Sequence, residues 1–162
     1  MSQENFEALK EFFMNHPVAI KSAAPLKTGV EVGVIFSKDM SEYTFRKEKQ
    51  GVSLYPGRPK DPDFTVLLGD KVVPKITSLQ SNDIGAFGVE FFKAMISEND
   101  EEAARVKLNI GFIKITTHGY LKILALGGMT LLKWLAVKGI KGPAGIKEAF
   151  DKLKKESEKH KL

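Results

Sequence analysis

Hydrophobic residues recur every three or four positions in three parts of the chain, which is the spacing of an amphipathic helix. The first part begins near the N-terminus and ends before Pro17, the second follows Ser81-Asn82-Asp83, and the third follows Pro143. Their apolar positions are Phe6, Leu9, Phe12 and Phe13, then Ile84, Phe87, Gly88, Phe91, Phe92, Met95 and Ile96, then Ile146, Phe150 and Leu153. We predict one helix in each part, and a loop around Pro25 after the first.

Between residues 30 and 68 the pattern changes to alternation of apolar and other side chains, which is typical of half-buried strands. Turn signals divide this region into four strands, at residues 30–36, 43–47, 52–55 and 64–68. The connection at residues 56–63 holds three prolines and cannot be helical. We predict a four-stranded antiparallel meander, followed by a short helix over residues 69–76.

A fifth strand is expected from Val106 through Ile115, after the middle helix. Its apolar face changes parity near Gly111, which predicts a bulge or kink there. Gly119 then begins a helix over residues 120–137 that is apolar almost all round, with a break expected at Gly127-Gly128. Segregated strands and helices predict an α+β fold with helices packed on one face of the sheet. We expect one domain over residues 1–142 and a Lys-rich amphipathic helix over residues 143–162.

The composition excludes several kinds of chemistry. The 162 residues include no Cys, which rules out disulfides, thiol catalysis and thiolate-bound metal. Three His are too few for a dedicated His metal site, so neither a metal nor a cofactor is expected. The net charge is +5, but Lys outnumbers Arg 22 to 3 and is mixed with acids, so nucleic-acid binding is not expected. A polar, acidic N-terminus without a basic region makes the cytoplasm the expected location.

No catalytic constellation is apparent. His118 lies at the predicted strand-to-helix junction, but no acid lies within about ten residues to orient it, as a general base would require. A capping or surface histidine explains it better. We therefore expect no enzyme activity and assign no catalytic residue. An enzyme that acts on a lipid thioester near His118 is the least favoured alternative.

Apolar content is in excess of what a plain core needs. The helix over residues 120–137 must be covered on several sides by protein, lipid or ligand. The chain also has 11 Phe and 5 Met, which suit bulky, adaptable linings. These features suggest a tunnel between the sheet and the helices that holds an acyl chain or a sterol. Periodicity alone favours the alternative, a filled core with a dimer interface on this helix.

The order of motifs resembles the sterol carrier protein (type two) domain over about residues 25–137. The resemblance is carried by Tyr43-Thr44-Phe45-Arg46, then Gly51-Val52-Ser53-Leu54, then Lys60-Asp61-Pro62-Asp63-Phe64-Thr65-Val66-Leu67-Leu68, and by the closing unit from Val106-Lys107-Leu108 to Gly119-Tyr120-Leu121. It implies a five-stranded mixed, mostly antiparallel sheet with helices on one face around an apolar tunnel. It also implies binding of fatty acids, fatty acyl-CoA, sterols or phospholipids, without catalytic residues.

The resemblance further implies which residues contact the ligand. By correspondence of elements they are Phe87, Phe91, Met95, Ile113, Ile115, Leu121, Leu124 and Trp134. The parity change at Gly111 and the long tail after Gly139 depart from the family's pattern. The leading hypothesis is non-enzymatic binding or transport of a lipid, and the alternative is a structural module that dimerises through residues 120–137. Expected partners are a small lipid, an anionic membrane surface met transiently by the last helix, and a second copy of the chain.

Overall fold

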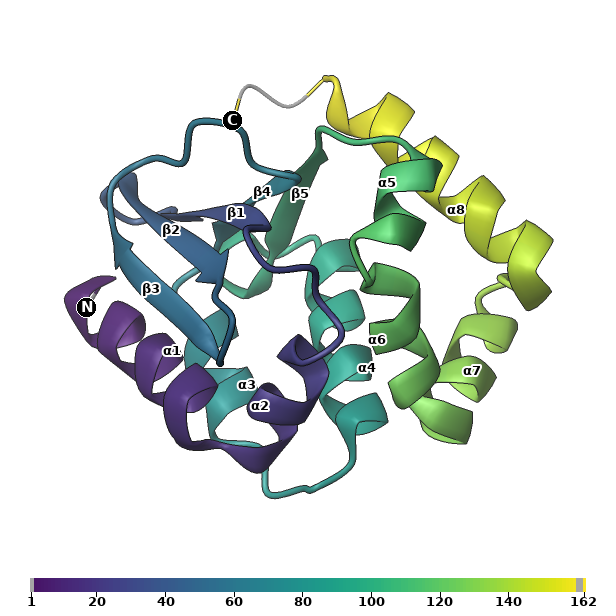
Figure 1. Cartoon of the computed structure of the whole chain (residues 1–162), viewed down its shortest axis with the longest axis horizontal. Coiled ribbons are helices and arrows are strands. Elements are labelled where there is room, and N and C mark those ends of the chain that lie inside the picture. Colours follow the sequence, from purple (N-terminus) through teal and green to yellow (C-terminus); the bar gives the residue numbers. More distant parts are fainter. Residues whose placement is uncertain (1, 160–161) are drawn as a thin grey trace.

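A five-stranded sheet with helices packed against it makes up the protein in the computed structural model, which describes residues 2–159 and 162 (Figure 1). Its strands are β1 (Glu31–Phe36), β2 (Ser41–Lys47), β3 (Val52–Pro56), β4 (Phe64–Leu68) and β5 (Ala104–Leu108), in the order β3-β2-β1-β4-β5. β1 and β4 run parallel, and every other neighbouring pair is antiparallel. The sheet is therefore mixed and mostly antiparallel, as the resemblance implies.

The prediction of a four-stranded meander is wrong in one connection. β4 does not pair with β3 but crosses to the far side of β1, where Val34 lies beside Val66. β1 is buried from Val32 to Phe36, so a neighbour on each side suits it as a central strand. Alternation of apolar residues fixes which face a strand buries, but it does not specify the strand beside it.

Helices follow the predicted order around the sheet. They are α1 (Ser2–Asn15), α2 (Pro17–Ala23), α3 (Val72–Thr77), α4 (Ile84–Ile96), α5 (Phe112–Thr117), α6 (Tyr120–Leu126), α7 (Gly128–Val137) and α8 (Gly142–Ser157), with a 3-10 turn η1 (Asp100–Glu102). α4 begins directly after Asp83, as predicted, and the Asp83 side chain caps it by accepting a hydrogen bond of 2.9 Å from the Gly85 amide.

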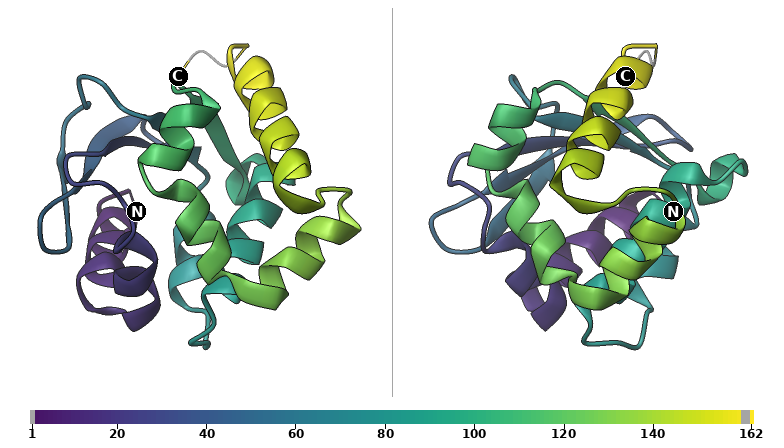
Figure 2. Two further views of the ribbon diagram at one scale, coloured as in Figure 1. Left: turned by 45° about the vertical axis from the view of Figure 1, so that its right-hand side comes forward. Right: turned by 90° about the vertical axis from the view of Figure 1, so that its right-hand side faces the viewer.

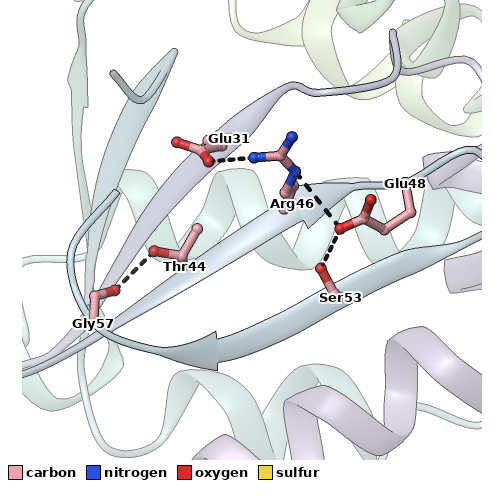
Figure 3. A network of polar contacts seen from close by, with 6 residues as sticks. All are labelled: Glu31, Thr44, Arg46, Glu48, Ser53 and Gly57. Atoms are coloured by element: carbon pink, nitrogen blue, oxygen red, sulfur yellow. Dashed lines mark hydrogen bonds and ion pairs between the residues drawn. The ribbon is translucent and has the colours of Figure 1, made fainter. Parts of the chain in front are cut away.

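One face of the sheet is apolar and carries the helices, while the other is polar. On the covered face, the rings of Phe6 in α1 and Tyr43 in β2 stack with centroids 4.3 Å apart. On the opposite face, Arg46 bridges two carboxylates, at 2.9 Å from Glu31 and 3.6 Å from Glu48 (Figure 3). This charged face explains why the helices gather on one side, as predicted.

The loop predicted around Pro25 contains a helix that the sequence analysis missed. α2 begins at Pro17, and its N-cap is His16, whose Nδ1 accepts a hydrogen bond of 3.1 Å from the Val18 amide. Proline is favoured in the first turn of a helix, where its missing N–H needs no partner. The first helix ends before Pro17, as predicted, and Pro17 also begins the next.

The fifth strand is shorter than predicted. β5 ends at Leu108, and α5 begins at Phe112, so Ile113 and Ile115 lie on a helix rather than on a strand. The Ile115 amide donates to the Gly111 carbonyl at 3.0 Å, which is a helical contact. The parity change near Gly111 therefore marks the change from a strand to a helix, not a bulge.

The predicted break in the long apolar helix is confirmed. α6 and α7 are bent by 101° relative to each other. Gly128 has a φ of +59°, a left-handed conformation that glycine adopts without steric cost, and it lies at the bend. Among the described residues no single helix has the length and apolar composition to cross a bilayer, and α6 and α7 meet both criteria only when taken together across their bend.

α8 lies along the open edge of the sheet at β5 (Figure 2). Its last residue, Ser157, is only 1% exposed, and its hydroxyl oxygen accepts a hydrogen bond of 3.0 Å from the Leu108 amide. The same hydroxyl donates to the Lys154 carbonyl at 2.9 Å. The C-terminal helix thus satisfies a buried amide of an edge strand.

We expect Ser157→Ala to lower the free energy of unfolding by about 1–3 kcal/mol, because it leaves the buried Leu108 amide without a partner. Chemical denaturation followed by circular dichroism measures the change. Ser78→Ala is the matched control, because Ser78 is exposed and its hydroxyl makes only a 3.5 Å contact with Lys75. Equal stability of the two variants would show that the bond between α8 and β5 contributes nothing.

Candidate functional site

A cavity of about 350 Å³ lies between the apolar face of the sheet and the helices. It is partly open to the surface, and α1 to α4, α6, α7 and three strands contribute its walls. The lining residues are Leu9, Phe12, Phe13, Val18, Ser22, Ala23, Leu26, Val32, Val34, Phe45, Phe64, Val66, Leu68, Val72, Val73, Ile76, Ile84, Phe87, Gly88, Phe91, Phe92, Tyr120, Ile123, Leu124 and Leu131. The volume falls in the range of roughly 300–1,000 Å³ that is typical of small-molecule sites.

The lining is almost entirely apolar. Among the described residues that line it, only Ser22 and Tyr120 bring side-chain polar atoms, and none is charged. Both hydroxyls already donate to the protein: Ser22 to the Ala19 carbonyl at 3.0 Å and Tyr120 to the Asp63 carboxylate at 2.8 Å. The cavity therefore suits hydrocarbon, and an ionised group placed deep inside it would have no partner among these side chains.

Aromatic contacts between elements hold the walls in place. The ring of Phe87 in α4 lies 5.6 Å from Phe12 in α1 and 5.3 Å from His16, measured between ring centroids. On the other side of α4, Phe92 stacks on Trp134 of α7 with centroids 6.0 Å apart. α4 is thus fixed between α1 and α7 by edge and stacking contacts, which aromatic pairs favour.

A buried polar cluster lies where α6 begins. Asp63, in the loop before β4, is 5% exposed, and its Oδ2 atom lies 2.7 Å from His118 Nδ1 and 2.8 Å from the Tyr120 hydroxyl. Gly119 lies between these two donors with a φ of +97°, so the chain can turn there and bring both neighbours to one carboxylate. Burial, and then the negative charge of Asp63, raises the pKa of Tyr120 well above its usual range.

Three of the eight residues predicted to contact a ligand line this cavity: Phe87, Phe91 and Leu124. Met95 packs against the main core, and Trp134 contacts the cavity wall through Phe92. The other three lie elsewhere. Ile115 is buried with Leu108 and Ile110, and Leu121 packs against that small cluster. Ile113 is 81% exposed on α5. Contact of the eight with a ligand stays a prediction.

The sequence analysis missed two parts of this site. The walls from α1 and α2 were not included, although the Phe12-Phe13 pair of the first amphipathic stripe was a usable signal. The partner of His118 was also missed, because Asp63 is 55 residues away in the sequence and only the fold brings the two together. Among the described residues no three His, Asp or Glu side chains are placed to hold a metal ion together.

No family model and no curated protein matches the chain. A solved structure named "UbiJ-SCP2 Ubiquinone synthesis protein" is similar, at 15% identity and a TM-score of 0.44, over 78% of this chain and 94% of the other. Its name contains the abbreviation of the domain that the sequence resembles. At this identity and score, the similarity says nothing about a ligand.

We expect Tyr120→Phe to lower the free energy of unfolding by about 1.5–3 kcal/mol at neutral pH, because the buried Asp63 carboxylate loses a donor while the ring volume is kept. Denaturant titration measures this. The matched control is Tyr55→Phe, at an exposed position on the polar face of β3, for which we expect almost no change. A Tyr120→Phe variant as stable as the wild type would contradict a structural role for the cluster.

Comparison of the wild type with Tyr120→Phe also gives a pH test. Unfolded tyrosine ionises near pH 10, whereas the raised pKa keeps Tyr120 protonated in the folded state. Above about pH 10 the unfolded state therefore binds fewer protons, and the free energy of unfolding falls by up to about 1.4 kcal/mol per pH unit for this group. We expect the wild type to lose stability more steeply than Tyr120→Phe over this range. Parallel curves would contradict the burial of this hydroxyl.

Proposed function

We propose that the protein binds the hydrocarbon part of a lipid in the cavity and acts as a non-enzymatic lipid-binding or carrier protein. The observation that carries the proposal is the cavity itself: about 350 Å³ of space with a lining in which only Ser22 and Tyr120 bear polar side-chain atoms. Apolar walls exposed to water are unfavourable, at roughly 25 cal/mol per Å² of surface. A hydrophobic guest removes that cost.

The size of the void supports the same proposal. Closing this partly open cavity over an empty interior would cost about 24 cal/mol per Å³, or roughly 8 kcal/mol for its volume. That is comparable with the whole net stability of an ordinary domain, about 5–15 kcal/mol. The rival hypothesis of a filled core predicts that these side chains meet only one another, and a space of this volume supports a guest molecule instead.

The chemistry of the lining restricts how a lipid is held. Because no charged side chain and no uncommitted hydroxyl donor in the described part of the chain faces the cavity, we place the hydrocarbon inside and the polar head at the opening. A fatty acid, a fatty acyl-CoA, a sterol or a phospholipid fits this arrangement. Each methylene group moved from water into the cavity contributes about 0.8 kcal/mol.

The carrier proposal includes no catalytic step. His118 does not line the cavity. Its Nδ1 atom is hydrogen-bonded to Asp63 beside Tyr120. A proton held between His118 and a buried carboxylate orients the junction of α5 and α6. We propose this positioning role for His118 instead of the role of a general base.

Native mass spectrometry of protein purified from cells tests the proposal directly. We expect an added mass equal to that of a lipid, and displacement of that lipid by a fluorescent fatty acid that becomes brighter in the cavity. Protein without added mass that also fails to bind fatty-acid and sterol probes would overturn the proposal.

A matched pair of substitutions locates the binding. Val34 and Val106 both face the core from the sheet, but only Val34 lines the cavity. We expect Val34→Phe to fill part of the void, to weaken probe binding at least about tenfold, and to leave the free energy of unfolding almost unchanged. Val106→Phe overpacks a filled region and should cost about 1–3 kcal/mol while probe affinity is kept. Equal probe affinity of Val34→Phe and the wild type would contradict binding in this cavity.

A further inference from the structure

Charge is distributed unevenly along the chain. Residues 103–147 contain eight of the 25 basic residues and none of the 20 acidic ones. The remainder therefore has 17 basic and 20 acidic residues and is slightly negative, although the whole chain has a charge of +5. The cationic segment includes α5, α6 and α7, which form one side of the molecule (Figure 2).

α7 has two apolar sides, and only one of them is covered. Leu131 and Leu135 are buried against the protein. Residues 129, 132, 133, 136 and 137 follow helical spacing on the other side, which we call the outer face of α7. Met129, Leu132 and Val137 are 64%, 44% and 84% exposed there. Such a concentration of exposed apolar side chains on one helix marks an interaction site.

Exposed lysines also occur on α6, on α7 and at the end of α7. Lys133 lies within the outer face, Lys122 is exposed on α6, and Lys138 follows the last turn with its ammonium 5.5 Å from the Trp134 ring centroid. The Asp83 carboxylate contacts α7, where it accepts a hydrogen bond of 2.7 Å from the Thr130 hydroxyl. It also accepts one of 2.9 Å from the Gly85 amide. An apolar stripe with cations beside it is the pattern of a helix that lies in a membrane interface.

The charge also favours an anionic bilayer over a second copy of the chain as the partner of this face. In a two-fold dimer the same surface meets itself, so Lys133 and its neighbours would approach their own copies with no acid from residues 103–147 between them. Like charges placed against each other at an interface are strongly unfavourable. An anionic bilayer offers hydrocarbon to Met129, Leu132 and Val137 and phosphate groups to the lysines, which satisfies both features.

The Lys-rich last helix is a weaker candidate for this contact. Over its length α8 has four lysines and three acids, and two of the lysines are paired with two of the acids. Lys147 contacts Asp151 at 2.7 Å and Lys152 lies 4.0 Å from Glu156, each four residues apart. Paired charges on a solvated helix leave little net attraction for an anionic surface.

We propose that the outer face of α7 docks the protein onto a bilayer that carries anionic phospholipids. The apolar side chains enter the interface and the lysines around them meet lipid phosphates. The opposite side of the same helix pair lines the cavity through Ile123, Leu124 and Leu131. Docking does not depend on what the cavity holds, so it goes beyond the proposed lipid binding.

Co-sedimentation of the full chain with vesicles tests the proposal. We expect binding to an equal mixture of phosphatidylcholine and phosphatidylglycerol, little binding to phosphatidylcholine alone, and weakening by salt. Met129→Asp combined with Leu132→Asp should abolish vesicle binding. Met40→Asp combined with Ile96→Asp is the matched control, because both residues are exposed and lie outside α7, and the net charge changes equally. Circular dichroism and fatty-acid probe affinity should be unchanged in both double variants.

Single lysine variants distinguish α7 from α8. We expect Lys133→Gln to weaken vesicle binding about fivefold and Lys152→Gln to leave it unchanged. The proposal is overturned by a wild type that does not bind anionic vesicles, or by an α7 double variant that still binds them. It is also overturned if sedimentation without vesicles shows a dimer that the α7 double variant dissociates. Probe binding reports separately on the cavity, so failure of docking and failure of lipid binding are distinguishable.

Discussion

The arrangement around the cavity depends on one buried carboxylate. Asp63 accepts hydrogen bonds from His118 and Tyr120 through a single oxygen, its amide donates to the Glu31 carbonyl at 2.9 Å, and its carbonyl accepts from the Asn109 amide at 2.8 Å. One residue therefore joins β1, the end of β5 and the start of α6. Such a cluster is stable only while every member has its partner, which fixes the position of α6 relative to the sheet.

This fixed position explains how an apolar cavity can persist. Apolar side chains alone tend to close a void, because contact with one another removes them from water. Here the start of α6 is held by Asp63, and the start of α7 is held by the bond between Thr130 and Asp83, the residue that caps α4. The Phe92–Trp134 stack lies between α4 and α7. Polar contacts at the start of α6 and at the start of α7 thus keep the helices apart where the lining is almost entirely apolar.

The sequence was sufficient for the fold class, because periodicity reports directly which side of an element is buried. It placed α1, α4 and the break between α6 and α7, and it identified α8. It failed where pairing is set by distant segments: β4 beside β1, and Asp63 beside His118. It also failed for the short helices α2 and α5, whose seven and six residues establish no helical period, although it did predict the equally short α3.

The candidate site was predictable only in part, for a related reason. Phe87, Phe91 and Leu124 line the cavity because their helices face the sheet, which an apolar stripe indicates. Ile113 does not line it, because it lies on α5 and not on the predicted strand. Residues that share a face of a strand point in different directions on a helix. Cavity volume depends on packing between elements, which no stripe in the sequence specifies.

The helix pair α6 and α7 answers the question that its composition raises. A helix that is apolar all round needs cover on several sides, and the structure supplies this cover unequally. Leu131 and Leu135 face the protein, whereas Met129 and Val137 face outward. The bend at Gly128 separates α6, which begins at the Asp63 cluster, from α7, which lies at the margin of the molecule. One apolar segment thereby contributes both a wall of the cavity and an uncovered outer face. Because residues 103–147 contain no acids, the charge around that face is positive.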